Sequence, residues 1–165
     1  LDTGDILYVQ PVAIDPDMTS GELFDRVSAI GAKTLVEILP KIEAGKLPPK
    51  KQEESLATKA PSLTKEMAQF DFTQPAAHIH NWVRGMNPWP MAWFVTTGGK
   101  KVKVTECRVA ASDGEAPGTV LSTKPLTVAC ADGAVQLLHV VPEGKKPMDG
   151  TSFAAGLRLK AGDTL

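Results

Sequence analysis

The sequence has 165 residues, of which 42% are hydrophobic and 22% charged, and this ordinary balance excludes disordered and collagen-like classes. No apolar run approaches the roughly 20 residues that cross a bilayer, and no signal-peptide pattern opens the chain, so we expect a cytoplasmic protein. The net charge of −1 hides an asymmetry, because residues 1–50 carry five basic and eight acidic side chains while the rest carry 13 and 11. This tilt permits the second part to contact a polyanion.

The first predicted elements are a strand and a long helix. Residues 6–14 form an extended, largely apolar run with an internal proline, which is typical of an edge strand. Thr19 and Glu22 have the spacing of a capping box, and an apolar stripe at helical spacing continues from there to Gly45. A strand and a single helix cannot bury their apolar faces on each other alone. We therefore expect residues 1–50 to be the last strand–helix unit of a larger α/β domain.

A linker and a second helix are predicted next. Residues 51–72 are polar and lack sustained periodicity, as expected for a segment that crosses a surface. Thr73 is the predicted N-cap of a helix that ends at Gly85. The predicted buried stripe of this helix consists of Ala76, Ile79 and Val83.

The pattern then changes from helical to strand-like. A β-hairpin is predicted over residues 91–109, with its turn at Gly98-Gly99, because valines alternate with lysines along its second strand. Further short strands are predicted over residues 118–121, 126–131 and 135–141. Closely spaced strands with one helix indicate a small β-barrel of the oligonucleotide/oligosaccharide-binding (OB) type over residues 73–165, closed by a turn of helix at 151–159.

Cysteine and histidine spacing argues against a metal site. Cys107 and Cys130 lie outside any CxxC spacing and are interpreted as buried strand residues. His78 and His80 are two residues apart on a predicted helix, so their side chains point to different faces. Because zinc needs three or four converging ligands, we expect no metal.

Three segments carry a resemblance to a known family. They are Leu1-Asp2-Thr3-Gly4-Asp5, Ala60-Pro61-Ser62-Leu63 and Arg84-Gly85-Met86-Asn87-Pro88-Trp89-Pro90. With them, the sequence resembles the methionyl-tRNA formyltransferase family over nearly its whole length. The resemblance implies that residues 1–50 end a Rossmann-like formyltransferase domain, that 51–72 are a linker, and that 73–165 form an OB-fold-like tRNA-binding domain. Because the chain starts on Leu1 rather than Met, we expect it to be the C-terminal portion of such an enzyme.

The resemblance also implies a reaction. In this family a formyl group moves from 10-formyltetrahydrofolate to the α-amino group of methionine on initiator tRNA. The resemblance implies that Asp2 is a catalytic residue and that Leu1 and Asp2 contact the folate. Without the resemblance, the local sequence Asp2-Thr3-Gly4 is typical of a turn. The family's catalytic asparagine and histidine come from an upstream segment that these 165 residues lack, so we expect the chain alone to be inactive. Its expected partner is an N-terminal part of the same enzyme as a separate polypeptide, and it is otherwise expected to be a monomer.

Basic residues in the linker and the predicted barrel are the expected contacts to initiator methionyl-tRNA. They are Lys59, Lys65, Lys100, Lys101, Lys103, Arg108, Lys145 and Lys146. A solvated, lysine-bearing strand face explains the same residues on charge alone, and the resemblance favours tRNA. Trp82, Trp89 and Trp93 are candidate platforms for unpaired bases, although Trp89 and Trp93 fit better as a core plug between helix and barrel.

Two other function classes stay open. The chain could be a tRNA-binding module without catalysis, in which case binding weakens steeply with salt and does not depend on Asp2. It could also belong to a related hydrolase that uses 10-formyltetrahydrofolate, or to a sugar formyltransferase. Either of these relatives predicts no affinity for tRNA.

Overall fold

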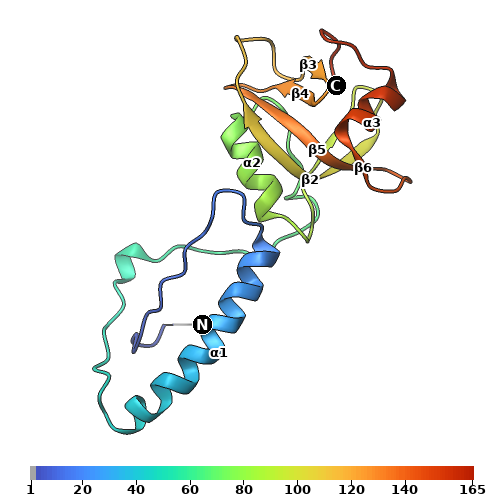
Figure 1. Ribbon diagram of the computed structural model, residues 1–165. Helices are drawn as coiled ribbons and strands as arrows, with labels where there is room; N and C mark the ends of the chain where they lie inside the picture. Colours follow the sequence, from blue (N-terminus) through green and yellow to red (C-terminus); the bar gives the residue numbers. More distant parts are fainter. Residues whose placement is uncertain (1–2) are drawn as a thin grey trace. The chain divides into compact units, whose positions relative to one another are not determined.

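The computed structural model describes residues 3–165, which form two compact units that meet between Ser62 and Leu63 (Figure 1). The catalytic and folate-binding assignments of Leu1 and Asp2 lie outside the described residues.

The first unit is built on the helix α1, Ser20–Glu43. The predicted capping box is confirmed: the Glu22 backbone N–H donates to Thr19 Oγ1 over 3.2 Å, and the Thr19 backbone N–H donates to Glu22 Oε2 over 2.8 Å. The hydrogen bond from the Thr19 backbone lowers the pKa of the Glu22 carboxyl. At the other end the predicted stop at Gly45 is confirmed, since this residue has φ +64° and its N–H donates to Ile42 O over 2.9 Å.

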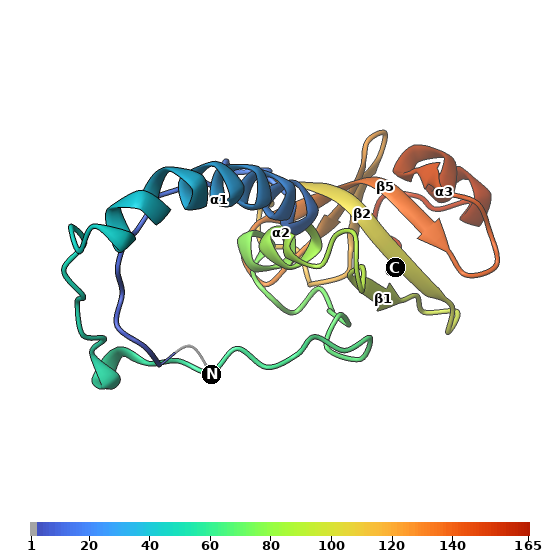
Figure 2. The same cartoon turned by 90° about the horizontal axis from the view of Figure 1, so that it is seen from below.

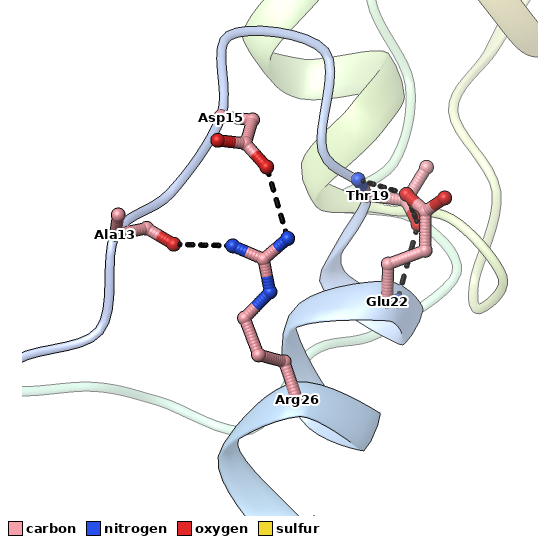
Figure 3. A network of polar contacts seen from close by, with 5 residues as sticks. All are labelled: Ala13, Asp15, Thr19, Glu22 and Arg26. Atoms are coloured by element: carbon pink, nitrogen blue, oxygen red, sulfur yellow. Dashed lines mark hydrogen bonds and ion pairs between the residues drawn. The ribbon is translucent and has the colours of Figure 1, made fainter. Parts of the chain in front are cut away.

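A second polar contact ties the segment before α1 to the helix (Figure 3). Arg26 donates from Nη1 to the Ala13 carbonyl oxygen over 2.9 Å and from Nη2 to Asp15 Oδ2, also over 2.9 Å. All of these groups are exposed, so the contact orders the approach to the helix and contributes little to stability.

The strand predicted over residues 6–14 is wrong. The backbone pairing found there is one isolated antiparallel bridge between Ile6 and Lys50, and residues 7–15 form no strand. A strand needs a neighbouring strand to accept its hydrogen bonds and cover its side chains. Without one, Val9 is 66% exposed, and Phe24 and Val36 on α1 are each 72% exposed. Within residues 3–62 only Met18 is buried, so the described part of this unit has no hydrophobic core.

The predicted linker contains both exposed chain and core residues. Residues 51–62 are exposed, with one short 3₁₀ turn at Glu54–Leu56. The rest differs from the prediction, because Ala68, Phe70 and Phe72 are buried in the core of the second unit. The burial of these side chains was not predicted, because an irregular segment has no periodicity that indicates which residues point inward.

The helix α2, Ala76–Gly85, buries the predicted stripe of Ala76, Ile79 and Val83. The predicted N-cap is wrong: Pro75 occupies that position, and the Thr73 N–H instead donates to Asp71 Oδ1 over 2.9 Å in a turn before the helix. The helix packs on two long strands of a sheet.

That sheet has six antiparallel strands, and the predicted hairpin is confirmed as its first pair. The strands are β1 Trp93–Val95, β2 Lys101–Ala110, β3 Val120–Thr123, β4 Leu126–Ala129, β5 Ala134–Pro142 and β6 Met148–Asp149. Their order is β1-β2-β5-β4-β3, and β6 pairs with β5. Figures 1 and 2 show β2 and β5 crossing the unit, with α2 and α3 on either side of them.

The predicted closed barrel is not confirmed, because no pairing among residues 3–165 joins β1 to β3. Irregular segments cover the two edges instead. The Phe70 N–H donates to Trp93 O over 2.9 Å at β1, and the Val120 N–H donates to Asp163 O over 2.8 Å at β3. Once these edge groups are satisfied, the sheet has no need to close on itself.

The helix predicted near the end of the chain is α3, Gly150–Leu157. Asp149 is its N-cap and accepts from the Ser152 N–H over 2.8 Å, and hydrogen bonds from Ser152 lower the pKa of the Asp149 carboxyl. A Cβ built on Gly150 would lie 1.8 Å from the Leu137 carbonyl oxygen, so only glycine lets α3 start in contact with β5.

The core of the second unit is continuous. Three phenylalanine rings meet at its centre: Phe72 and Phe94 have ring centroids 5.1 Å apart, and Phe70 lies 5.7 Å from each. Cys107 and Cys130 are buried thiols, as expected, and burial raises the pKa of Cys130 to about 11.

Candidate functional site

The candidate site begins with the lysines of β2. Lys101 and Lys103 share one face of the strand and are half-buried, while Val102 and Val104 on the other face are fully buried. This alternation follows from the two-residue period of a strand, which places every second side chain on the solvent side. Lys103 lies opposite Trp93 in β1 and Val141 in β5, near the middle of the outer face.

Trp93 connects this face to a third lysine. Lys101 Nζ lies 3.6 Å from the centroid of a Trp93 ring, which is a cation–π contact. The indole Nε1 of Trp93 donates to the backbone oxygen of Lys65 over 2.9 Å. The structure therefore brings Lys65, from the segment before the core, next to the lysines of β2.

The turn between β5 and β6 provides the other side of the site. Lys145 and Lys146 are exposed there, in a turn that Gly144 allows with φ +70°. A cleft of about 300 Å³ lies between this turn and β2, and its lining includes Lys101, Lys103 and Lys145. Three sequence-predicted lysines thus line one cleft, with Lys100 at the neighbouring hairpin turn.

An apolar pocket of about 550 Å³ adjoins this lysine cleft. Its buried lining includes Val102, Phe153 and Leu165, and its exposed lining includes Lys100 and Lys145. Sequence reasoning missed the pocket because it treated residues 151–159 only as a closing helix. No spacing within residues 150–157 distinguishes a helix beside a pocket from a closing helix.

Other predicted site residues are not brought to this place. Arg108 lies seven residues from Lys101 along β2, about 23 Å at strand spacing. Lys59 belongs to the exposed chain of the first unit. The three tryptophans also separate: Trp93 packs on the core, Trp82 stacks on His78, and Trp89 is 55% exposed, so the core-plug interpretation is wrong for Trp89.

Two classes of feature are absent from residues 3–165. No three histidine, cysteine, aspartate or glutamate side chains converge there as a metal site would require. No helix in that range is long and apolar enough to cross a membrane.

The fold and the site together define a small antiparallel β-domain with a basic face beside an apolar pocket, preceded by a helical unit whose described residues, 3–62, form no core of their own. The model of the formyl transferase C-terminal domain family matches residues 62–158, more than half of the sequence. The chain therefore belongs to the formyl transferase family, which confirms the resemblance seen in its motifs.

Comparison with curated proteins gives the same family. The chain is 44% identical over its whole length to methionyl-tRNA formyltransferase from Solibacter usitatus, covering 53% of that protein. It is 41% identical over 98% of its length to methionyl-tRNA formyltransferase from Allorhizobium ampelinum, covering 52% of it. The chain thus spans about half the length of the curated relatives that it matches.

Among solved structures, HypX from Aquifex aeolicus in complex with tetrahydrofolic acid has a similar fold. The TM-score is 0.68 at 19% identity, over 97% of this chain and 29% of HypX. At that identity the match shows the fold alone.

Proposed function

We propose that this chain is the C-terminal half of a methionyl-tRNA formyltransferase. This enzyme transfers a formyl group from 10-formyltetrahydrofolate to the α-amino group of methionyl initiator tRNA in the cytoplasm. The observation that carries the proposal is the 38–44% identity to relatives of that name, sustained over at least 98% of the chain. The cluster of lysines on the second unit supports it independently, because it offers a surface for a polyanion.

The second unit is proposed to bind the tRNA. Lys100, Lys101, Lys103 and Lys145 line the two adjoining cavities, and Lys146 extends the basic face along the turn. The backbone of Lys65 lies beside them, where its oxygen accepts from Trp93. Within residues 3–165, Lys100, Lys103 and Lys145 form no ion pair with an acidic side chain, so their charges are available to phosphates. Holding the tRNA here keeps the methionyl amine near the formyl donor, and such positioning lowers the barrier of a two-substrate reaction.

The first unit is proposed to complete the catalytic domain. Its helix α1 buries no residue, and the apolar run over 6–14 is exposed, so both need a further part of the protein to cover them. We assign that role to an N-terminal half that also supplies the folate pocket and the catalytic asparagine and histidine. Asp2 would join them, helping the attacking amine to lose its proton.

A formylation assay tests this function. The chain alone is expected to make no formyl-methionyl-tRNA, whereas the chain fused to the N-terminal half of the Solibacter usitatus relative is expected to make it. The matched control is the same fusion with Asp2→Ala, which should lose activity but keep tRNA binding. Formylation by the chain alone, or an Asp2→Ala fusion with full activity, would show that the catalytic assignment is wrong.

A further inference from the structure

The apolar pocket beside the lysine cleft is not explained by phosphate binding alone. Lysines that only neutralise phosphates need a flat or grooved polar surface, whereas this pocket of about 550 Å³ has a floor of Val102, Phe153 and Leu165. Its size lies within the roughly 300–1,000 Å³ typical of sites that enclose a small organic group. The chemistry of the occupant must therefore combine an apolar body with negative charge.

The rim of the pocket supplies that charge preference. Lys100 on the β1–β2 turn and Lys145 on the β5–β6 turn stand on two sides, and both also neighbour the lysines of the adjoining cleft. Glu143 is the one acidic side chain that lines either cavity. The resulting field favours a ligand whose charged groups flank its apolar part.

We propose that this pocket receives one unstacked base of a single-stranded RNA segment, with the adjacent phosphates on Lys100 and Lys145. The proposal rests on the proposed function, because it makes the base part of the bound tRNA. A nucleotide matches both observations, since its base has an apolar face and its phosphates are anionic.

The polar groups of the pocket indicate tolerance for any base. Thr97 Oγ1 donates to the Thr164 carbonyl oxygen over 3.4 Å, and Ser152 Oγ donates to Asp149 Oδ2 over 2.7 Å. Because these hydroxyl protons are already used, they are not free to read the edge of a base. Thr96 Oγ1, which also lines the pocket, accepts from the Lys100 N–H over 3.2 Å and can itself donate to a base edge, but a hydroxyl can pair with any base and does not select one by itself.

An acidic peptide fits this site less well than RNA. Peptides commonly bind a β-domain by adding a strand to an open sheet edge. Here residues 68–70 cover the edge of β1 and residues 162–164 cover the edge of β3. A peptide would have to leave backbone donors and acceptors unpaired along its whole length, whereas a base presents apolar faces and carries its polar groups only at its edge.

Filling the pocket tests the proposal. Gly156 is an exposed residue of α3 that lines the pocket, and a Cβ built on it meets no atom within 4 Å, so Gly156→Phe adds a ring at the pocket without a clash at its Cβ. Ala155→Phe adds the same ring to an exposed neighbour that does not line the pocket, and it is the matched control. Both variants are made in the full chain.

The probes are a four-nucleotide single-stranded oligoadenylate and an abasic oligomer with the same phosphates. We expect the oligoadenylate to bind about tenfold more tightly, because the abasic oligomer has no base to bury in the pocket. It should also shift the methyl NMR signal of Met148, which lines the pocket, while the abasic oligomer should not. Gly156→Phe should abolish the tenfold difference, and Ala155→Phe should keep it.

The opposite results separate this proposal from the tRNA-binding function. If both probes bind equally and Met148 does not shift, the base pocket is refuted, even where salt-dependent tRNA binding persists. A dimer that Gly156→Phe disperses would show that a second copy covers the pocket, which also overturns the proposal. If the wild-type chain did not bind tRNA but oligoadenylate still shifted the Met148 signal, the proposed function would be refuted, whereas the pocket would still be a nucleotide-binding site.

Discussion

The start of α3 provides the sharpest test of the packing that creates the pocket. Gly150 and Gly156 belong to the same eight-residue helix, and each can be changed to alanine. At Gly150 the new Cβ would lie 1.8 Å from the Leu137 carbonyl oxygen and 3.4 Å from Leu126 Cβ, whereas at Gly156 it meets nothing within 4 Å. The same substitution should therefore have opposite effects at the two positions.

The expected magnitudes follow from these distances. Relieving a 1.8 Å contact with backbone on both sides requires α3 to move away from β5, and overpacking of this kind costs about 3 kcal/mol. Gly156→Ala replaces a glycine that weakens the helix and introduces no clash, so it should raise the free energy of unfolding by about 0.5–1 kcal/mol. For a unit of about 100 residues, each kcal/mol shifts Tm by roughly 4–8 °C. Gly150→Ala should therefore lower Tm by about 12 °C or more, and Gly156→Ala should raise it by about 2–8 °C.

Tryptophan fluorescence during thermal unfolding of the full chain is the suitable assay, because all three tryptophans lie in the second unit. Unfolding in urea at constant temperature gives the free-energy difference directly. If Gly150→Ala were within 1 kcal/mol of the wild-type chain, or if the two variants changed stability in the same direction, the close contact between α3 and β5 would be refuted.

Three further predictions concern charge and burial. Replacing Lys103 and Lys145 with alanine should reduce the slope of log K against log salt for tRNA by about 1.5, while Lys124→Ala, in the distant β3–β4 turn, should not change it. Because hydrogen bonds from Ser152 depress the folded pKa of Asp149, its charge stabilises the fold above its unfolded value of 3.8, and this contribution is lost as pH falls through the lower folded pKa. In a pH series of Tm, Asp149→Asn should therefore be less stable than wild type at pH 6, and the difference should disappear at the acidic end; a constant difference would contradict this. Cys130, buried and with its pKa raised to about 11, should resist iodoacetamide at pH 8 in the folded chain and react only in denaturant, as mass spectrometry can show.

Locally encoded features were predictable from the sequence. The capping box at Thr19, the stop at Gly45 and the hairpin turn at Gly98-Gly99 all depend on residues a few positions apart. The alternation that leaves Lys101 and Lys103 outside was predictable for the same reason. Such signals require no knowledge of what packs where.

Features that depend on distant parts of the chain were not predictable. The apolar run over 6–14 has the composition of a strand, but among residues 3–165 its pairing is limited to the isolated bridge between Ile6 and Lys50. The predicted closed barrel was not confirmed, because residues 68–70 and 162–164 cover the sheet edges. Neither segment has a strand-like sequence pattern that would predict this role. The pocket depends on how Gly150 lets α3 approach β5, and no local spacing reveals that contact.

The most direct test of the central claim is the affinity of this chain for methionyl initiator tRNA over a range of salt concentrations. The account predicts binding that weakens linearly on a log–log plot, with a slope of several units that becomes shallower when Lys103 and Lys145 are replaced. Absence of binding at low salt, or binding that these substitutions leave unchanged, would contradict a tRNA-docking role for the second unit.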